Sequence, residues 1–180
     1  MDLKIAAKEK LDQIRERIIA LSHRIHANPE PGFGEVQASG WVVKFLSEEG
    51  FQVETGVCGL PTAFTARSGD GPLHVAICAE YDALPEIGHA CGHNIIAASA
   101  VGAAVAAARV ADAAGLTVHV LGTPGEEAGD AGGKILMLEQ GAFTNMHAAM
   151  MVHPAPSDNS RPNIIAASMF EIAYSGKEAH

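Results

Sequence analysis

The sequence predicts an α/β domain in which helices cover both faces of a mostly parallel or mixed sheet. Two segments with a helical spacing of apolar residues come first, within residues 1–50. Short apolar runs typical of strands follow, and helix-like segments separate the last of them. Strands that alternate with helices of this length indicate a partly parallel sheet with helical layers on both sides.

The first predicted helix is amphipathic and ends before the Asn-Pro-Glu-Pro-Gly turn at 28–32. Its apolar side chains recur at intervals of three and four residues, at Leu11, Ile14, Ile18, Leu21 and Ile25. A second helix follows, and Gly50 is its expected end. We expect its buried side to consist of Val36, Trp41, Val42, Phe45 and Leu46.

The remaining elements alternate between strands and helices. Short strands are expected at 51–57 and 62–69, and the segment 72–82 is apolar enough to be a strand buried on both faces. An alanine-rich helix is then expected within 95–115 and a short helix at 132–141. Two further strands, at 116–122 and 148–154, complete the predicted sheet.

Composition excludes several classes of partner. The 180 residues carry a formal net charge of -9 and no cluster of Lys or Arg, which argues against nucleic acid and anionic membranes as partners. The long alanine-rich run contains Arg109 and Asp112, so it does not resemble a membrane span. Three irregularly spaced cysteines make no disulfide framework, and the N-terminus has no signal-peptide pattern. We therefore expect a cytoplasmic protein with a small-molecule or peptide partner.

Reactive side chains follow three of the predicted strands. Cys91 and His93 come after the strand at 72–82, Glu126 and Glu127 after the strand at 116–122, and His153 at the end of the last strand. In open α/β sheets, ligands bind beyond the carboxyl ends of the strands. Thiolate, imidazole and carboxylate groups are ligands of divalent transition metals. The sequence therefore predicts a metal site at this edge of the sheet.

The spacing of these residues fits metal-assisted hydrolysis. Cys91 and His93 are two positions apart, so in an extended loop they point the same way, and Gly92 between them allows close backbone approach. Glu126 and Glu127 are adjacent and point apart in extended chain, so one can bind metal while the other holds a water. The spacing does not decide which glutamate has which role. Zinc suits the thiolate, and manganese or cobalt are alternatives.

Two other functions fit part of the pattern. Cys91 with a histidine base is a candidate nucleophile of a cysteine hydrolase, although that leaves the adjacent glutamates without a role. A non-catalytic module held together by bound metal is the second alternative. Activity that alkylation abolishes and chelators do not would favour the cysteine hydrolase. Bound metal without any turnover would favour the non-catalytic module.

Four segments in order resemble the M20 metallopeptidases. They are AEYDALPEIGHACGHN at 79–94, TPGEEAGD at 123–130, MVHP at 151–154 and YSGKEAH at 174–180. Cys-Gly-His is similar to the amidohydrolase branch of that family, and LSHRIHANPEPGFGE at 21–35 resembles the N-terminal signature of the branch. The sequence of the segment at 79–94 is most similar to that of the subgroup of M20-domain dipeptidases and aminobenzoyl-glutamate hydrolase subunits. Asn94 departs from the aspartate that many members have at this position.

The resemblance implies a zinc-exopeptidase-like domain that hydrolyses an amide bond with two divalent metal ions. The substrate it implies is an N-acyl amino acid, a dipeptide or an aminobenzoyl-glutamate type compound. The metal ligands it implies are Cys91, His93, Glu127 and His153. It further implies that Glu126 is the general base, that Asp82 orients a ligating imidazole, and that His180 stabilises the oxyanion in a partner subunit.

The family pattern also implies a division of the chain. Residues 1–163 are expected to be the N-terminal part of the catalytic domain, and 164–180 the start of a smaller α+β lid domain. Members of the family are longer, take a further metal ligand from their C-terminal part and dimerise largely through the lid. We therefore expect these 180 residues to be an N-terminal piece of such a protein and the longer protein to be a homodimer.

Overall fold

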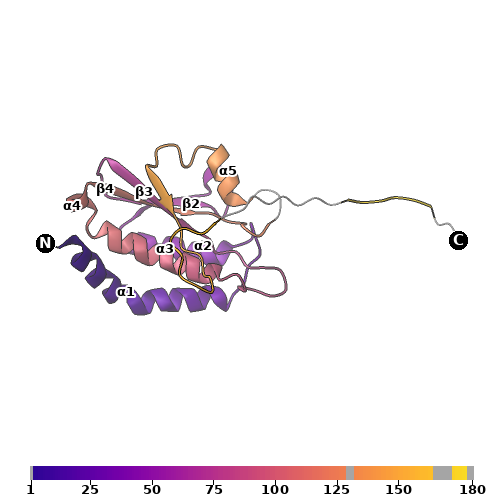
Figure 1. Cartoon of the computed structure of the whole chain (residues 1–180), viewed down its shortest axis with the longest axis horizontal. Helices are drawn as coiled ribbons and strands as arrows, with labels where there is room; N and C mark the ends of the chain where they lie inside the picture. Colours follow the sequence, from indigo (N-terminus) through magenta and orange to yellow (C-terminus); the bar gives the residue numbers. More distant parts are fainter. Residues whose placement is uncertain (1, 129–131, 164–171, 178–180) are drawn as a thin grey trace.

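The computed structural model describes residues 2–128, 132–163 and 172–177, and it places five strands in one mixed sheet (Figure 1). Their order across the sheet is β1-β2-β4-β3-β5. The strands are β1 (Gln52–Thr55), β2 (Phe64–Ser68), β3 (Leu73–Ala79), β4 (Leu116–Gly122) and β5 (Ala148–Met150). The predicted α/β class with a mixed sheet is confirmed.

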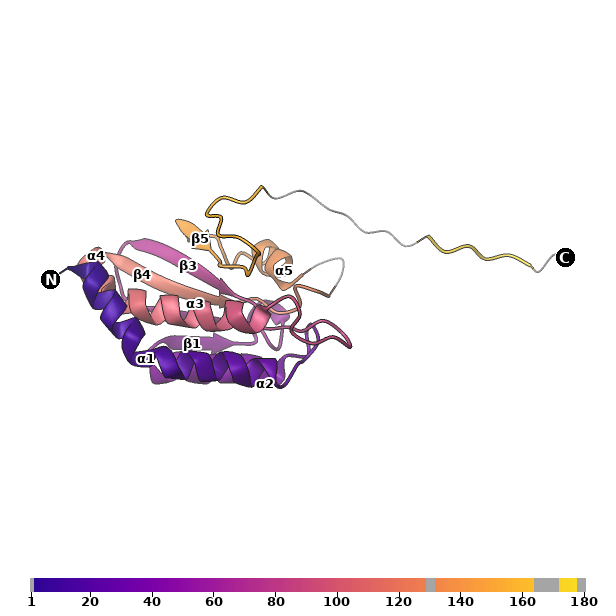
Figure 2. The same ribbon diagram turned by 60° about the horizontal axis from the view of Figure 1, so that its bottom comes forward.

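Helices lie on both faces of this sheet. They are α1 (Leu3–His26), α2 (Val36–Glu48), α3 (His93–Ala108), α4 (Ala111–Ala114) and α5 (Gly133–Glu139), with a short 3-10 turn at Val57–Gly59. Figure 2 shows α1, α2 and α3 together on one side of the sheet, with α5 on the other. Met137 of α5 packs on Ala76 and Leu121, which face away from the larger core formed with α1, α2 and α3.

Strand directions determine where the loops gather. β1 pairs with β2 and β2 with β4 in antiparallel register, whereas β3 runs parallel to both β4 and β5. Parallel neighbours have their carboxyl ends at the same edge of a sheet. The loops that leave β3, β4 and β5 therefore start side by side, and α3 begins at this same edge with His93.

The packing of the N-terminal helices differs from the sequence prediction at two positions. Ile14, Leu21 and Ile25 are buried as expected, but Leu11 is 40% exposed and Val36 is 69% exposed. Val36 is the first residue of α2. Side chains of a helix tilt toward its N-terminus, so the side chain of the first residue extends beyond the helix and not onto the core. Leu11 rests against α3 beside Gly102, where a Cβ would lie 3.2 Å from its Cδ1 atom. Gly102 thus permits a close approach of α1 and α3.

The alanine-rich run forms two helices and not the single one expected. It divides after α3, where Val110 adopts φ -120° and ψ 6° and turns its side chain into the core. The short α4 then ends at Gly115 in the left-handed conformation, which leads directly into β4. Within the part of the chain that the structure describes, no helix combines the length and the apolar character that crossing a membrane requires.

Candidate metal centre

The residues expected to bind metal come together at the carboxyl edge of β3, β4 and β5. Ligand atoms of Cys91, His93 and His153 lie within 4.8 Å of one another, and so do those of His93, Glu126 and Glu127. His93 belongs to both groups, which makes it the centre of the cluster. The structure therefore assembles the five residues that sequence spacing placed at three separate strand ends.

His93 is fully buried, and its two ring nitrogens have different surroundings. Nδ1 lies 2.8 Å from Oδ1 of Asp82, while Oδ2 of Asp82 accepts a hydrogen bond from the backbone N–H of Glu127 at 2.9 Å. A carboxylate at Nδ1 favours the tautomer that leaves a lone pair on Nε2. This arrangement suits a metal-binding imidazole, and it links the loop after β3 to the loop after β4.

The Nε2 atom of His93 faces an anionic space. Oxygens of Glu80, Glu126 and Glu127 lie 3.5, 3.7 and 3.9 Å from it. Within the described ranges, Nε2 of His93 and Oε2 of Glu80 are buried without a hydrogen-bond partner. Buried polar atoms are normally satisfied, and carboxylates around a free imidazole nitrogen are compatible with a bound cation. The residues present therefore fit a divalent metal ion at this position.

Cys91 and His153 form the solvent side of the cluster. Cys91 Sγ lies 3.6 Å from His153 Nε2, and His153 Nδ1 lies 2.8 Å from the carbonyl oxygen of Pro154. An Nδ1–H that donates to this carbonyl leaves Nε2 free as a ligand. Burial, a hydrogen bond to Glu127 and the surrounding carboxylates raise the pKa of Cys91 to about 11. Without a cation, Cys91 is therefore a thiol at neutral pH.

Cys91 and His93 converge by a different route from the extended loop that we expected. Gly92 between them has φ +85° and is the residue before the first turn of α3. A Cβ at Gly92 would lie 2.8 Å from Cγ of Pro154, the residue after His153. The left-handed glycine turns the chain so that Cys91 precedes the helix and His93 opens it. The close backbone approach that was predicted for Gly92 is made to the His153 segment.

Glu126 and Glu127 do not point apart as predicted for extended chain. Both lie in a turn after β4, where Gly125 has φ +63°, and both carboxylates approach the same atom of His93. Burial raises the pKa of Glu126, and the neighbouring charge of Glu127 raises it further. Glu126 is the more exposed of the two. A half-exposed carboxylate with a raised pKa is suited to proton transfer.

The N-terminal signature supports this turn. Glu35 is completely buried and accepts hydrogen bonds from the N–H groups of Phe33 and Gly125, at 2.9 and 2.8 Å, and from the hydroxyl of Thr62. It thereby fastens the loop before α2 to the residue that precedes Glu126. Sequence reasoning gave Glu35 no role, because a single acidic residue in a turn is normally a surface group.

Glu80 is the other residue near the site that sequence reasoning missed. It directly follows β3 and is only 1% exposed. The signal in the sequence was its position, since a charged residue that ends a strand buried on both faces has no route to solvent. His180, for which the family resemblance implies an oxyanion role, lies outside the described residues, as does most of the expected lid segment 164–180.

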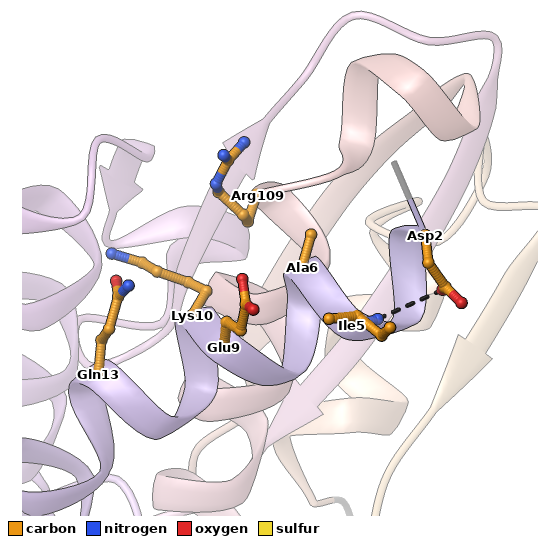
Figure 3. Close-up of a pocket in the computed structure, with 7 residues that line it drawn as sticks. All are labelled: Asp2, Ile5, Ala6, Glu9, Lys10, Gln13 and Arg109. Carbon is orange, nitrogen blue, oxygen red and sulfur yellow. Dashed lines mark hydrogen bonds between the residues drawn. The ribbon is translucent and has the colours of Figure 1, made fainter.

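Figure 3 shows the residues that line a separate surface pocket, whose volume is about 290 Å³. It is bounded by the start of α1 and by Arg109, which follows the last residue of α3. Because α3 begins with His93, the pocket lies roughly 24 Å away, the length of sixteen helical residues. The lining residues are Asp2, Ile5, Ala6, Glu9, Lys10, Gln13 and Arg109. With no thiol or imidazole, this pocket does not offer the predicted metal chemistry.

Comparison with known proteins identifies the family. Residues 76–174, more than half of the chain, match the model of "Peptidase family M20/M25/M40". The chain belongs to this family. The M20 resemblance predicted from the sequence is thereby confirmed.

Relatives of this M20 family chain include named enzymes. The Xaa-Arg dipeptidase of Mus musculus is 41% identical over 192 residues, which cover 99% of this chain and 44% of the dipeptidase. One of the p-aminobenzoyl-glutamate hydrolase subunits of Escherichia coli (strain K12) is 32% identical over 165 residues, or 81% of this chain and 34% of that protein. The chain thus spans less than half the length of these curated relatives.

A solved M20 structure has the same fold. The YxeP protein of Bacillus subtilis, a dinuclear metal-binding peptidase from the M20 family, matches with a TM-score of 0.62 and 25% sequence identity. The match covers 77% of this chain and 42% of YxeP. The α/β architecture is therefore that of a known M20 peptidase.

Proposed function

We propose that this protein hydrolyses the amide bond of a dipeptide, an N-acyl amino acid or an aminobenzoyl-glutamate type substrate with the help of two divalent metal ions. The observation that carries the proposal is the free Nε2 of buried His93, which a thiol, a second imidazole and carboxylates surround. Membership of the M20 family supports it, and so does the similarity to the Xaa-Arg dipeptidase and the p-aminobenzoyl-glutamate hydrolase subunit.

Four residues are proposed as the metal ligands of this chain. They are Cys91, His93, Glu127 and His153. When bound, divalent ions supply Lewis acidity: they polarise a carbonyl group and lower the pKa of water. Zinc suits the thiolate and imidazole donors best, manganese suits the carboxylates, and cobalt is a further alternative.

Protein groups are proposed to move the proton. Glu126, with its raised pKa and its partial exposure, takes a proton from the attacking water and returns it to the leaving amine. Asp82 holds His93 in the tautomer that leaves Nε2 free. The role of His180 in binding the oxyanion stays a prediction from the family resemblance.

The surroundings of Cys91 disfavour the alternative of a cysteine nucleophile. Nucleophilic cysteines need a lowered pKa, because the thiolate is the reactive form. Here the pKa is raised to about 11 by burial and by the neighbouring carboxylates. A bound cation reverses that balance, since it stabilises the thiolate directly. The same surroundings therefore favour a metal ligand.

Replacing the proposed base is the test of this function. The Glu126→Gln variant should keep its metal and lose turnover by roughly 10²- to 10⁴-fold, the usual contribution of a general base. Xaa-Arg dipeptides, N-acetyl amino acids and p-aminobenzoyl-glutamate are suitable substrates, with metal content measured on the same samples. Glu139→Gln, an exposed change on α5, is the matched control.

Two outcomes contradict the proposal. Full activity in Glu126→Gln would show that Glu126 is not the general base. Activity that survives complete chelation but disappears on alkylation of Cys91 replaces the metal mechanism with a thiol mechanism.

We also propose the homodimer and the cytoplasmic location expected from the sequence. Support for the dimer comes from the family resemblance, and support for the location from the odd number of scattered cysteines. Sedimentation of the purified protein tests the first, and fractionation of cells tests the second.

A further inference from the structure

The Glu80 carboxylate lies between His93 and a positively charged side chain. Lys134, the second residue of α5, forms an ion pair with Oε1 of Glu80. The side chain of Lys134 is about two-thirds buried, and that of Glu80 is almost completely buried. This pair therefore links α5 to the end of β3.

The start of α5 is packed so that Lys134 reaches this position. The N–H of Gly133 donates to the carbonyl of Pro124 at 2.9 Å. A Cβ on Gly133 would lie only 2.1 Å from that carbonyl oxygen, so the residue must be glycine for the helix to approach. Pro124 leads into the turn that holds Glu126 and Glu127. The position of Lys134 is thus tied to the loop that supplies two carboxylates of the candidate centre.

The two oxygens of Glu80 face in two directions. Oε1 forms the ion pair with Lys134, while Oε2 lies 3.5 Å from Nε2 of His93. A buried carboxylate is costly unless it is paired with an opposite charge. Lys134 supplies that charge at Oε1, and apart from this ion pair neither oxygen of Glu80 has a hydrogen-bond partner among the described residues.

We propose that Glu80 is a further anionic member of the metal centre and that Lys134 is its built-in counter-charge. The inference rests on the proposed function, because it assumes that a cation occupies the space at His93 Nε2. Glu80 attracts the cation through Oε2. Lys134 keeps the empty centre folded and opposes the cation by its own positive charge.

The two residues therefore have opposite effects on metal affinity. Glu80→Gln should bind metal roughly 10- to 100-fold more weakly, as is typical when a carboxylate beside the ligands is lost. Lys134→Met should bind metal at least about fivefold more tightly, because one repelling charge is gone. Its metal-free form should melt at a lower temperature, since Glu80 is left buried and unpaired. Lys134→Arg, which keeps the charge, should stay close to the unaltered protein.

Cobalt titration of the purified protein in competition with a coloured chelator measures these affinities. The thiolate-to-cobalt absorption band of Cys91 reports independently that the ion occupies the proposed site, and Cys91→Ser should abolish that band. Lys44→Met is the matched control, because Lys44 is an exposed lysine paired with a glutamate on the surface of α2. In the Glu80→Gln/Lys134→Met double variant, the loss of melting temperature caused by Lys134→Met alone should disappear.

The outcomes separate this inference from the proposed function. Equal cobalt affinity in the unaltered protein, Glu80→Gln and Lys134→Met overturns the inference and leaves the metal centre intact. Failure of the unaltered protein to bind cobalt, zinc or manganese overturns both. If Lys134→Met does not fold, an unchanged affinity in Glu80→Gln is sufficient to reject the inference.

Discussion

Asp82 contacts two residues of the candidate centre that lie in different loops, His93 and Glu127. One carboxylate oxygen lies 2.8 Å from Nδ1 of His93, and the other accepts the N–H of Glu127 at 2.9 Å. Asp82 is only 1% exposed, so its carboxylate does not exchange these partners for water. It can therefore fix the orientation of an imidazole ligand and the position of a carboxylate ligand at once.

Replacing Asp82 by Asn tests this role. The Asn amide can keep only one of the two accepting oxygens, so His93 or the Glu127 backbone loses its partner. We expect metal affinity to fall by roughly 10- to 100-fold. Isothermal titration with zinc measures the change. Asp70→Asn, an exposed aspartate in the turn before β3, should leave the affinity unaltered, and an equal loss in both variants would contradict a local effect.

At the scale of elements, the start of α3 depends on Gly92. Its φ of +85° is disfavoured for residues with a side chain, by about 1–2 kcal/mol. A Cβ there would also press on Pro154 at 2.8 Å and push away the segment that carries His153. The same glycine thus serves the helix start and the assembly of the metal centre.

Gly92→Ala should therefore lower the free energy of unfolding by at least about 1–2 kcal/mol and weaken metal binding. Gly40 provides the opposite case, since it lies inside α2 with open space where a Cβ would be. Gly40→Ala should stabilise the protein by roughly 0.5–1 kcal/mol. Urea unfolding of both variants measures the difference. A neutral or stabilising Gly92→Ala substitution would show that the left-handed turn is not required.

Two neighbouring strands carry a histidine pair on the face of the sheet that α5 covers. Nδ1 of His74 on β3 lies 3.0 Å from Nε2 of His119 on β4, and the rings stack. Burial lowers the pKa of His119, and the nearby His74 and Arg67 lower it further. The folded state therefore binds this proton less readily than the unfolded chain, for which the ordinary pKa is about 6.5.

The sign of the pH effect follows from linkage. The contribution of His119 to stability is complete above its unfolded pKa and is lost as the pH falls through about 6.5 toward the lowered folded value. We expect the urea midpoint to drop between about pH 7.5 and about pH 5.5, and to drop less in His119→Gln. His23→Gln, an exposed change on α1, should behave like the unaltered protein. An identical drop in both variants would remove His119 as a cause.

At the scale of the whole molecule, the sequence was informative where local pattern and topology agree. The strand before Glu80 was recognisable from the apolar run at 75–79. Because parallel strands end at one edge, the positions of Cys91, Glu126 and His153 after separate strands already predicted that they would meet. The family pattern added the division of roles between the two glutamates, which spacing alone left open.

What the sequence did not predict depends on contacts between distant segments. The turn that brings Glu126 and Glu127 to one atom is held by Glu35, far away in the chain. Glu80 gained its significance only when α5 placed Lys134 beside it. Tertiary contacts of this kind have no local signature.

Metal content tests most directly whether the three strand ends form a metal centre. Plasma mass spectrometry of untagged protein, compared with its Cys91→Ser variant, counts the ions. For the full-length protein we predict two divalent ions per chain, and fewer in its Cys91→Ser variant and in residues 1–180 alone. Folded protein that holds no metal after reconstitution with zinc and with manganese would contradict the metal centre.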